Sequence, residues 1–209
     1  MSTRVTTVKD FCFGSHAVCV QEELTKIGED DSALGLGYYV WPSAIVLASF
    51  LADNTSLVLG KRVLELGAGT SLPGLLAVKL GAAHVTLTDK SELDLSNARQ
   101  SIELNGLDAS LFSLRPLLWG DDFTDQVDIL VAADCFYNPG DFEDVVATMA
   151  CILERNPGCA VITTYQLRSI YYTIQPSLTR WRLQAREIPH KSNEIDTDNV
   201  FLLQISRED

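Results

Sequence analysis

The chain has 209 residues, of which 46% are apolar and 21% charged, and its 16 basic and 28 acidic side chains give a net charge of −12. This composition is typical of a globular domain and excludes a disordered or collagen-like chain. No apolar run approaches the roughly 18 residues that a membrane helix needs, and the acidic balance argues against binding to phosphate backbones. We therefore expect a monomeric cytoplasmic or nuclear protein with neither membrane nor nucleic acid as a partner.

The five cysteines and three histidines predict no metal site. None of the cysteines forms a C-x-x-C pair, and the histidines are scattered along the chain, so the spacing of zinc ligands is absent. An odd number of cysteines without a secretion signal is typical of reduced thiols.

The first third of the chain predicts a hairpin, a loop and a helix. Residues 4–22 alternate apolar and polar side chains around Gly14-Ser15, which is the pattern of a β-hairpin. Residues 22–37 are polar and contain glycines, as in a loop. Pro42 stands where a helix can begin, and an apolar helical segment then runs to residue 53.

From residue 61 onwards, short apolar strands alternate with amphipathic helices. This alternation predicts an α/β fold with a mostly parallel sheet and helices on both faces. Two closing strands after the last helix indicate an antiparallel edge. The predicted strands are 62–66, 84–88, 110–116, 127–133, 159–164, 181–188 and 200–206, and the predicted helices are 73–80, 91–105, 141–155 and 169–180.

The strongest motif is the turn Gly67-Ala68-Gly69 at the end of the first of these strands. Glycines there let the backbone approach a ligand without a Cβ atom in the way. A dinucleotide site needs a third glycine where this chain has Leu72. Glu65, just before the turn, is awkward for a pyrophosphate but suits a ligand with an ammonium group. The alternative is a purely structural turn.

Asp89 ends the next strand, 20 residues after Gly69. A carboxylate at this place can accept hydrogen bonds from both ribose hydroxyls, and the alternative is an N-cap for the helix predicted near Ser91. Glu65 and Asp89 together indicate S-adenosylmethionine, a nucleoside with an amino-acid tail and no phosphate.

Three motifs and two flanking segments resemble the family-16 seven-β-strand protein methyltransferases. The resemblance extends over about residues 36–206, and it implies a Rossmann-like, seven-stranded class I methyltransferase fold. It divides the chain into an N-terminal hairpin and loop, residues 1–37, packed on a methyltransferase domain, residues 38–209, as one structural unit. The matching segments are 39–43, 64–74, 119–120, 134–137 and 164–168.

The resemblance also implies a role for single residues. Trp41 lies over the cofactor pocket, Asp89 holds the ribose and Trp119 packs against the adenine. Asp134 and Tyr137 belong to a D-x-x-Y motif that faces the substrate amine, and they are the candidate catalytic residues. Alternatives are a staple before a helix for Trp41, a core position for Trp119 and a turn cap for Asp134. The remaining cofactor-binding residues are Glu65, Gly67, Ala68, Gly69 and Ala133.

The chemistry of methyl transfer favours lysine as the acceptor. A lysine ε-amine must first lose a proton from a group whose pKa is about 10.4, and a nearby carboxylate raises that pKa. Asp134 is therefore expected to orient the amine and not to act as a strong base. Arg168 is expected to pair with an acid for structural reasons.

An arginine acceptor would need paired carboxylates. Asp141, Glu143 and Asp144 supply them only if the start of their helix folds over the site. The sequence thus predicts a protein methyltransferase that uses S-adenosylmethionine and releases S-adenosylhomocysteine. It acts on lysine or alternatively on arginine, and a noncatalytic partner-binding protein with the same fold is the other alternative.

The stretch between Arg115 and Arg155 contains nine acidic residues and no lysine or arginine. It includes both Trp119 and Asp134, so its charge borders the expected acceptor entrance. It is either a solvated face that serves solubility or a field that attracts a basic peptide. The expected partner is a protein substrate, with a basic segment or a chaperone as the candidates.

Overall fold

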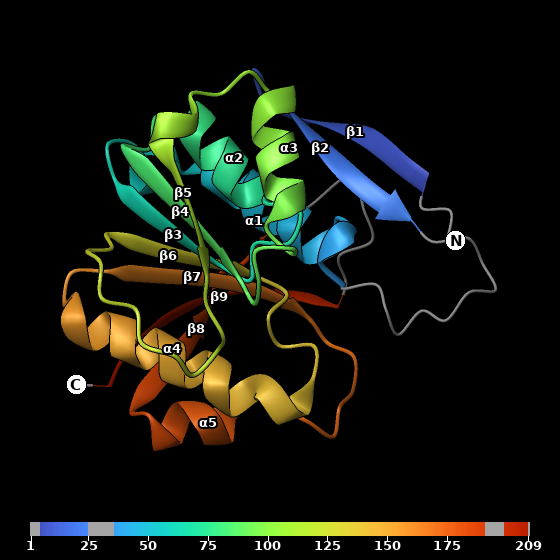
Figure 1. Ribbon diagram of the computed structural model, residues 1–209. Coiled ribbons are helices and arrows are strands. Elements are labelled where there is room, and N and C mark those ends of the chain that lie inside the picture. Colours follow the sequence, from blue (N-terminus) through green and yellow to red (C-terminus); the bar gives the residue numbers. More distant parts are fainter. Residues whose placement is uncertain (1–4, 25–35, 191–198, 209) are drawn as a thin grey trace.

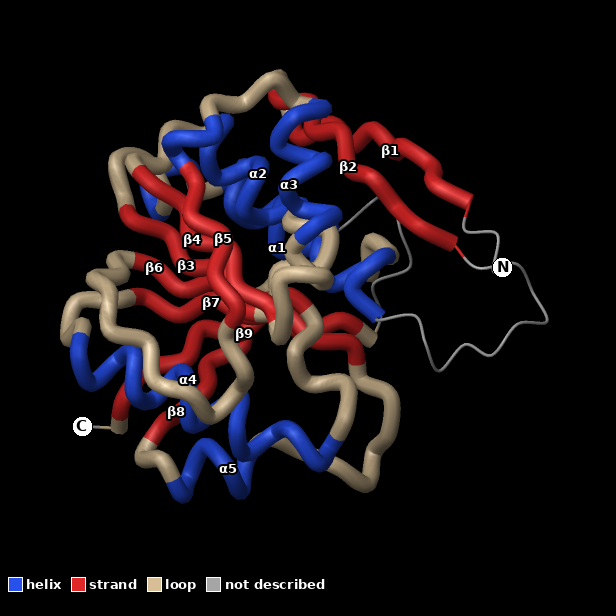
Figure 2. The backbone as a smooth tube through the Cα atoms, viewed as in Figure 1, coloured by secondary structure: helices blue, strands red, loops and turns tan. Residues whose placement is uncertain are grey.

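The computed structural model describes residues 5–24, 36–190 and 199–208. In these ranges the main feature is a seven-stranded sheet with the order β5-β4-β3-β6-β7-β9-β8. Figure 2 shows it as a twisted layer of strands between two layers of helices. Its strands are β3 Arg62–Leu66, β4 His84–Asp89, β5 Phe112–Pro116, β6 Ile129–Ala133, β7 Ala160–Gln166, β8 Leu183–Glu187 and β9 Val200–Arg207.

Helices cover both faces of the sheet (Figure 1). α1 Pro42–Asp53, α2 Leu72–Lys79 and α3 Ser96–Leu104 lie on one face, and α4 Phe142–Arg155 and α5 Gln175–Arg180 lie on the other. The central strands are therefore buried on both sides, which explains why β6 is a continuous apolar run and why only the first residue of β3 is exposed. The predicted class, a mostly parallel sheet between two helix layers, is confirmed, and no helix in the described ranges is long and apolar enough to cross a membrane.

The strand order places a ligand site at the middle of the sheet. β3 pairs in parallel with β4 on one side and with β6 on the other. The chain thus winds outward from β3 to β5 and then returns to begin again at β6. Ligands bind at such a reversal, beyond the carboxyl ends of the strands, so the segments after β3, β4 and β6 face one another.

The antiparallel edge predicted for the sheet is present, with one refinement. β9 runs antiparallel to both of its neighbours, as the pairs Val161↔Ile205 and Ala185↔Ile205 show. β9 lies one place in from the edge, between β7 and β8, so the outermost strand runs in the same direction as β7.

Two predicted helices are shorter in the structure. The helix expected at residues 91–105 begins at Ser96, because residues 91–95 form a turn in which the Ser91 hydroxyl bonds Asp94 at 2.5 Å. The prediction of a helix at residues 169–180 was wrong for the first half of that range. Tyr171, with 87% of its surface exposed, and its neighbours have no face to bury, and the helix begins only at Gln175, next to Pro176.

The predicted hairpin is present as β1 Val5–Phe13 and β2 His16–Leu24, and Gly14 in the turn has a φ of +59°. The free edge of β2 bonds side chains of α3 and the residue after it. Asn105 makes bonds to both Cys19 N and Cys19 O at 3.0 and 2.6 Å, and Ser101 accepts from Gln21 N at 3.1 Å. The hairpin is thus anchored to the helix layer, and most of the loop predicted after it, residues 25–35, lies outside the described residues.

Candidate active site

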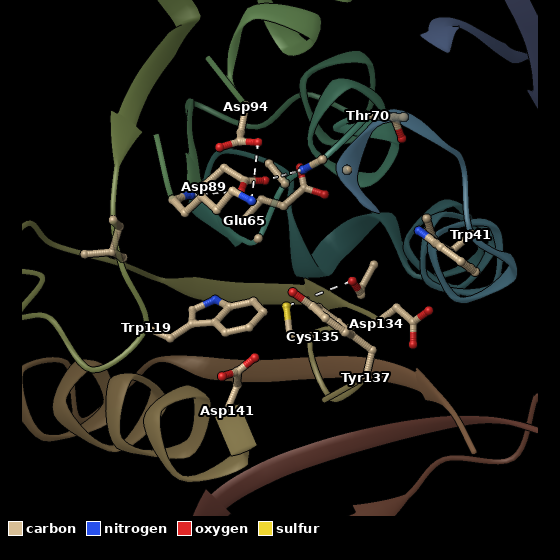
Figure 3. Close-up of a pocket in the computed structure, with 18 of the residues that line it drawn as sticks. Trp41, Glu65, Thr70, Asp89, Asp94, Trp119, Asp134, Cys135, Tyr137 and Asp141 are labelled. Atoms are coloured by element: carbon tan, nitrogen blue, oxygen red, sulfur yellow. Dashed lines mark hydrogen bonds and ion pairs between the residues drawn. The ribbon is translucent and has the colours of Figure 1, made fainter. Parts of the chain in front are cut away.

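A cavity of about 640 Å³ opens beyond the carboxyl ends of β3, β4 and β6. The structure brings all the site residues predicted from the sequence to its wall. In Figure 3, Glu65, Asp89 and Asp94 lie along one side, Trp119, Tyr137 and Asp141 along the other, and Trp41 at a third. The predicted residues at the wall are Trp41, Glu65, Gly67, Ala68, Gly69, Asp89, Trp119, Ala133, Asp134 and Tyr137.

The glycine turn allows close approach of the backbone to the cavity. Gly67 and Gly69 have φ angles of +63° and +51°, a region that side chains with a Cβ rarely adopt. A Cβ atom added to Gly67 would lie 2.9 Å from Cys135 Sγ and 3.3 Å from the ring of Trp119. The turn therefore requires glycine both for its conformation and for the packing of the opposite wall.

Gly74, in the first turn of α2, supports the site but is not among the site residues predicted from the sequence. A Cβ atom there would lie 2.4 Å from Glu65 Oε2 and 2.5 Å from Leu87, so glycine lets the helix pack tightly on the strands. The third glycine of a dinucleotide fingerprint has this packing role. Here this glycine stands two positions later than in the fingerprint. The Pro73-Gly74 pair was the feature of the sequence that could have indicated it.

Glu65 is a buried acid with no cation beside it in the described structure. Its side chain accepts a hydrogen bond from Gly74 N at 2.9 Å, and the residue is only 1% exposed. Burial raises the pKa of Glu65 to about 8, and the neighbouring charge of Asp89 adds to the rise. Glu65 is thus mostly protonated at pH 7, and a ligand ammonium would allow it to ionise.

Both carboxylate oxygens of Asp89 accept backbone hydrogen bonds. Gly69 N donates to Oδ2 at 2.9 Å and Lys90 N donates to Oδ1 at 2.8 Å. Burial raises the pKa of Asp89. Each oxygen has a second lone pair for a ribose hydroxyl. The N-cap alternative was wrong, because α3 begins only at Ser96 with Leu95 before it.

Aromatic rings form two parts of the cavity wall. Trp119 and Tyr137 lie edge to face with ring centroids 5.8 Å apart, and Tyr39 and Trp41 do so at 5.3 Å. Burial raises the pKa of Tyr137, which keeps its hydroxyl protonated and able to donate. Flat apolar faces of this kind suit an adenine ring and the methylene chain of an acceptor side chain.

Asp134 is held in a tight ion pair. It follows β6 with a φ of +58°, and its side chain is 4% exposed. Arg168 binds it through two parallel hydrogen bonds, Nη1 to Oδ1 at 2.9 Å and Nη2 to Oδ2 at 2.7 Å, and Gln166 N adds a third at 3.1 Å. The Arg168 guanidinium lies 5.3 Å from the centre of the Trp41 ring. The predicted structural pairing of Arg168 is confirmed, but the residue also lines the cavity.

The start of α4 does fold over the cavity. Asp141 and Asp144 line it, so two of the three carboxylates considered for an arginine site reach the cavity. Glu143 binds Trp181 Nε1 at 2.9 Å and Arg180 at 3.2 Å instead.

The cavity fits S-adenosylmethionine. The buried, unneutralised Glu65 matches the ammonium of the amino-acid tail, the glycine turn leaves room for that tail, and the Asp89 carboxylate matches the ribose hydroxyls. When bound, the cofactor supplies a methyl group on a positively charged sulfur. The residues of the chain need only align the acceptor with it and exclude water.

Comparisons with known proteins agree with this geometry. Residues 20–174 match the profile of a family described as lysine methyltransferase. The histone-arginine methyltransferase METTL23 of Xenopus laevis is 38% identical over 200 residues, which is 88% of this chain and 83% of the relative. METTL23 of Homo sapiens is 39% identical over 169 residues, 78% of this chain and 87% of the relative.

The fold also matches solved structures. The ribosomal protein L11 methylase from Lactobacillus delbrueckii subsp. bulgaricus superposes with a TM-score of 0.62 at 21% identity, over 82% of this chain and 81% of that one. At this identity the match shows the fold, and the sequence relatives show the family. The chain is a methyltransferase whose cofactor is S-adenosylmethionine, and it belongs to the lysine methyltransferase family.

Proposed function

We propose that this methyltransferase modifies a lysine side chain of a protein. The observation that carries the proposal is the acceptor side of the cavity, where Asp134 is neutralised by Arg168 and lies near the hydroxyl-bearing Tyr137. A wall of this kind can orient an uncharged amine without stabilising its protonated form. The description of the family as lysine methyltransferase supports the same acceptor.

In the proposed reaction, the lysine nitrogen attacks the methyl carbon as the carbon–sulfur bond breaks. The N–C bond forms, the electron pair of the broken bond stays on sulfur, and S-adenosylhomocysteine leaves. The amine gives its proton to solvent before the attack. Asp134 and Tyr137 orient the nitrogen, and alignment is the main contribution of the protein.

We assign the cofactor to the wall opposite the acceptor. Glu65 with the turn Gly67-Ala68-Gly69 holds the amino-acid tail, and Asp89 holds the ribose. Support comes from their burial and hydrogen bonds. The flanking residues assigned to the cofactor are Trp41, Trp119 and Ala133.

Arginine is the second candidate acceptor. Asp141 and Asp144 in the cavity wall provide two carboxylates for a guanidinium. Two relatives of 38% and 39% identity are named histone-arginine methyltransferases.

Labelling with methyl-tritiated S-adenosylmethionine tests the proposal. The protein is incubated with a cell extract and, separately, with purified core histones, and the labelled proteins are hydrolysed and analysed for methylated amino acids. Methyl-lysine is the expected product, and methyl-arginine would establish the second candidate. No protein-bound label, with S-adenosylhomocysteine still bound in calorimetry, would favour the noncatalytic alternative.

We further propose a monomer in the cytoplasm or nucleus, with residues 1–37 and 38–209 as one structural unit. All five cysteines are free, which suits a reducing compartment. As substrate we propose a basic protein segment or a chaperone, and the labelling experiment above identifies which of them is methylated. Light scattering after gel filtration measures the mass of the particle.

A further inference from the structure

The acceptor wall contains a carboxylate that the chain itself has neutralised. Asp134 uses one oxygen for Arg168 Nη1 and Gln166 N and the other for Arg168 Nη2. The side chain of Asp134 is almost fully buried, whereas that of Arg168 is 34% exposed and borders the cavity. The pair therefore presents nearly zero net charge to whatever enters from the acceptor side.

A free carboxylate in this place would oppose the reaction. An opposite charge within about 4–6 Å favours the charged form of an amine, and a protonated amine has no lone pair for attack. The same carboxylate is useful when it is paired, because its remaining lone pair, on Oδ2, can still accept a hydrogen bond from a neutral amine.

We propose that Arg168 is a positioning residue that neutralises Asp134 and so prepares the acceptor site for an uncharged amine. The inference rests on the proposed function. It assigns to Arg168 a role in selecting the protonation state of the acceptor, in addition to its packing. Because a guanidinium stays charged, the same arrangement discriminates against an arginine acceptor at this position.

The neighbours of the pair support this role. Trp41 offers a ring face to the guanidinium, which stabilises a cation without cancelling its charge. Tyr137 interacts electrostatically with Arg168. Because the pKa of Tyr137 is raised, its hydroxyl stays protonated at neutral pH and adds no charge to the acceptor wall. The other charged or titratable groups of the cavity wall are Tyr39, Glu65, Asp89, Lys90, Asp94, Cys135, Asp141 and Asp144.

The chain contains a matched pair far from the cavity. Arg62, at the start of β3, also binds Asp128 through two hydrogen bonds, with Nε to Oδ2 at 2.9 Å and Nη2 to Oδ1 at 2.7 Å. It lies at the amino end of the strands, opposite the site. Arg62→Met thus removes another doubly hydrogen-bonded Arg–Asp pair, a more exposed one, without touching the acceptor wall.

The test compares two ligands of the cofactor site by calorimetry. S-adenosylhomocysteine has no group at the position of the methyl, whereas sinefungin has an amine-bearing carbon in place of the sulfur and so directs an ammonium towards the acceptor side. Sinefungin should gain at least fivefold in affinity relative to S-adenosylhomocysteine in Arg168→Met, because the freed Asp134 attracts its ammonium. The relative affinity should stay at the parent value in Arg62→Met and return to it in the double variant Asp134→Asn/Arg168→Met.

An unchanged ratio in Arg168→Met would overturn the inference, whether or not a protein substrate is known. Arg168→Gln, which keeps a donor but no charge, takes its place if thermal unfolding shows that the methionine variant does not fold. Failure to label any protein would count against the proposed function alone, since the ligand ratio does not depend on turnover.

The pH profile gives a second readout once a substrate is identified. In Arg168→Met the rise of kcat/KM with pH should move to higher pH, because the exposed carboxylate holds the substrate amine in its protonated form. Arg168→Lys, which restores the charge, should recover most of the shift. A profile that stays in place while the rate falls would show a structural role only.

Discussion

Asp89 touches both the glycine turn and the space assigned to the ribose, so its replacement tests the cofactor site most directly. Asp89→Ala should weaken S-adenosylhomocysteine binding by at least about 10-fold in calorimetry, since hydrogen bonds to a charged group contribute about 1.5–3 kcal/mol each. Loss of the bond from Gly69 N adds to the effect by loosening the turn.

Asp89→Asn is the matched control for this change. Its amide oxygen can keep one backbone bond and one ribose bond, so its affinity should lie between those of the parent and the alanine variant. Unchanged affinity in Asp89→Ala would remove the residue from the cofactor site.

The buried Glu65 predicts that cofactor binding releases a proton. The pKa of Glu65 is raised to about 8, so at pH 7 the side chain enters the reaction protonated and ionises against the ammonium of the ligand. Calorimetry of S-adenosylhomocysteine in buffers of different ionisation enthalpy should therefore show close to one proton released per site. Glu65→Gln should abolish the release and weaken binding, and release of the same size in that variant would contradict the assignment.

The same residue affects stability with a defined sign. A carboxyl whose pKa is higher in the folded protein stabilises it at low pH, and this contribution is lost between the ordinary value of about 4.5 and about 8. For Glu65 the loss amounts to roughly 3–5 kcal/mol over that range. The ligand-free parent should lose stability in urea titrations over this interval more steeply than Glu65→Gln.

The sequence alone predicted that the site residues lie close together. It did not predict which of them form hydrogen bonds and ion pairs with one another. Gly67, Asp89 and Asp134 follow strands whose ends must meet, so their proximity is a consequence of strand order. Arg168 is 34 residues from Asp134 in the sequence. Its guanidinium reaches the cavity because of the path taken after β7, and local patterns carry no information about that path.

At the scale of elements, the hairpin supports the cavity wall through one buried acid. Glu22 Oε1 accepts from Val40 N at 2.8 Å, next to Trp41, and Oε2 pairs with Lys9 at 2.7 Å. Glu22→Ala would leave the buried Val40 N–H unpaired, which costs about 1–3 kcal/mol. We expect that loss in the free energy of unfolding, together with weaker S-adenosylhomocysteine binding.

A neighbour in β2 provides the control for the hairpin. Gln21 bonds Gln100 through its side chain at the surface, so Gln21→Ala should change stability by no more than about 0.5 kcal/mol. Glu22→Gln keeps an oxygen for Val40 N and should recover part of the loss. Cofactor affinity equal to the parent value in a folded Glu22→Ala variant would show that the hairpin does not support the wall.

The predicted elements agree best with the structure where burial sets the pattern. β3, β6 and α4 each have buried residues along most of their length, and their ends lie within about two residues of the prediction. The segment 169–174 has helical spacing of apolar residues, but only Ile174 is buried, and no described residue covers Ile170, Tyr171 and Tyr172. Its exposure depends on the position of α5, and no local pattern predicts that position.

At the scale of the whole molecule, the acidic stretch divides into two groups. Asp122 pairs with Arg155 at 2.6 Å and Asp125 pairs with Arg115, so the bases that bound the stretch neutralise acids within it. Apart from Asp134, which Arg168 neutralises, the acids of the stretch that line the cavity come from the start of α4. A steering field for a basic substrate would therefore arise mainly at the cavity and only weakly from the loop before β6.

This division changes which acids should control substrate association. In Asp141→Asn/Asp144→Asn, log kcat/KM for a peptide from the labelled substrate should fall less steeply with ionic strength than in the parent, because exposed charges are screened over about 10 Å at 0.1 M. Asp122→Asn/Asp125→Asn is the control and should keep the parent slope. Equal slopes in all three proteins would leave the acidic stretch with a role in solubility alone.

The position of β9 has a consequence for how the sheet opens. β8 precedes β9 in the chain, yet among the described strands it pairs only with β9. Any local unfolding that detaches β9 must release β8 as well and leave β7 as a bare edge, ready to pair with a strand of another molecule. Because β7 leads directly to Arg168, that opening would disturb the acceptor wall and expose an aggregation-prone edge in a single event.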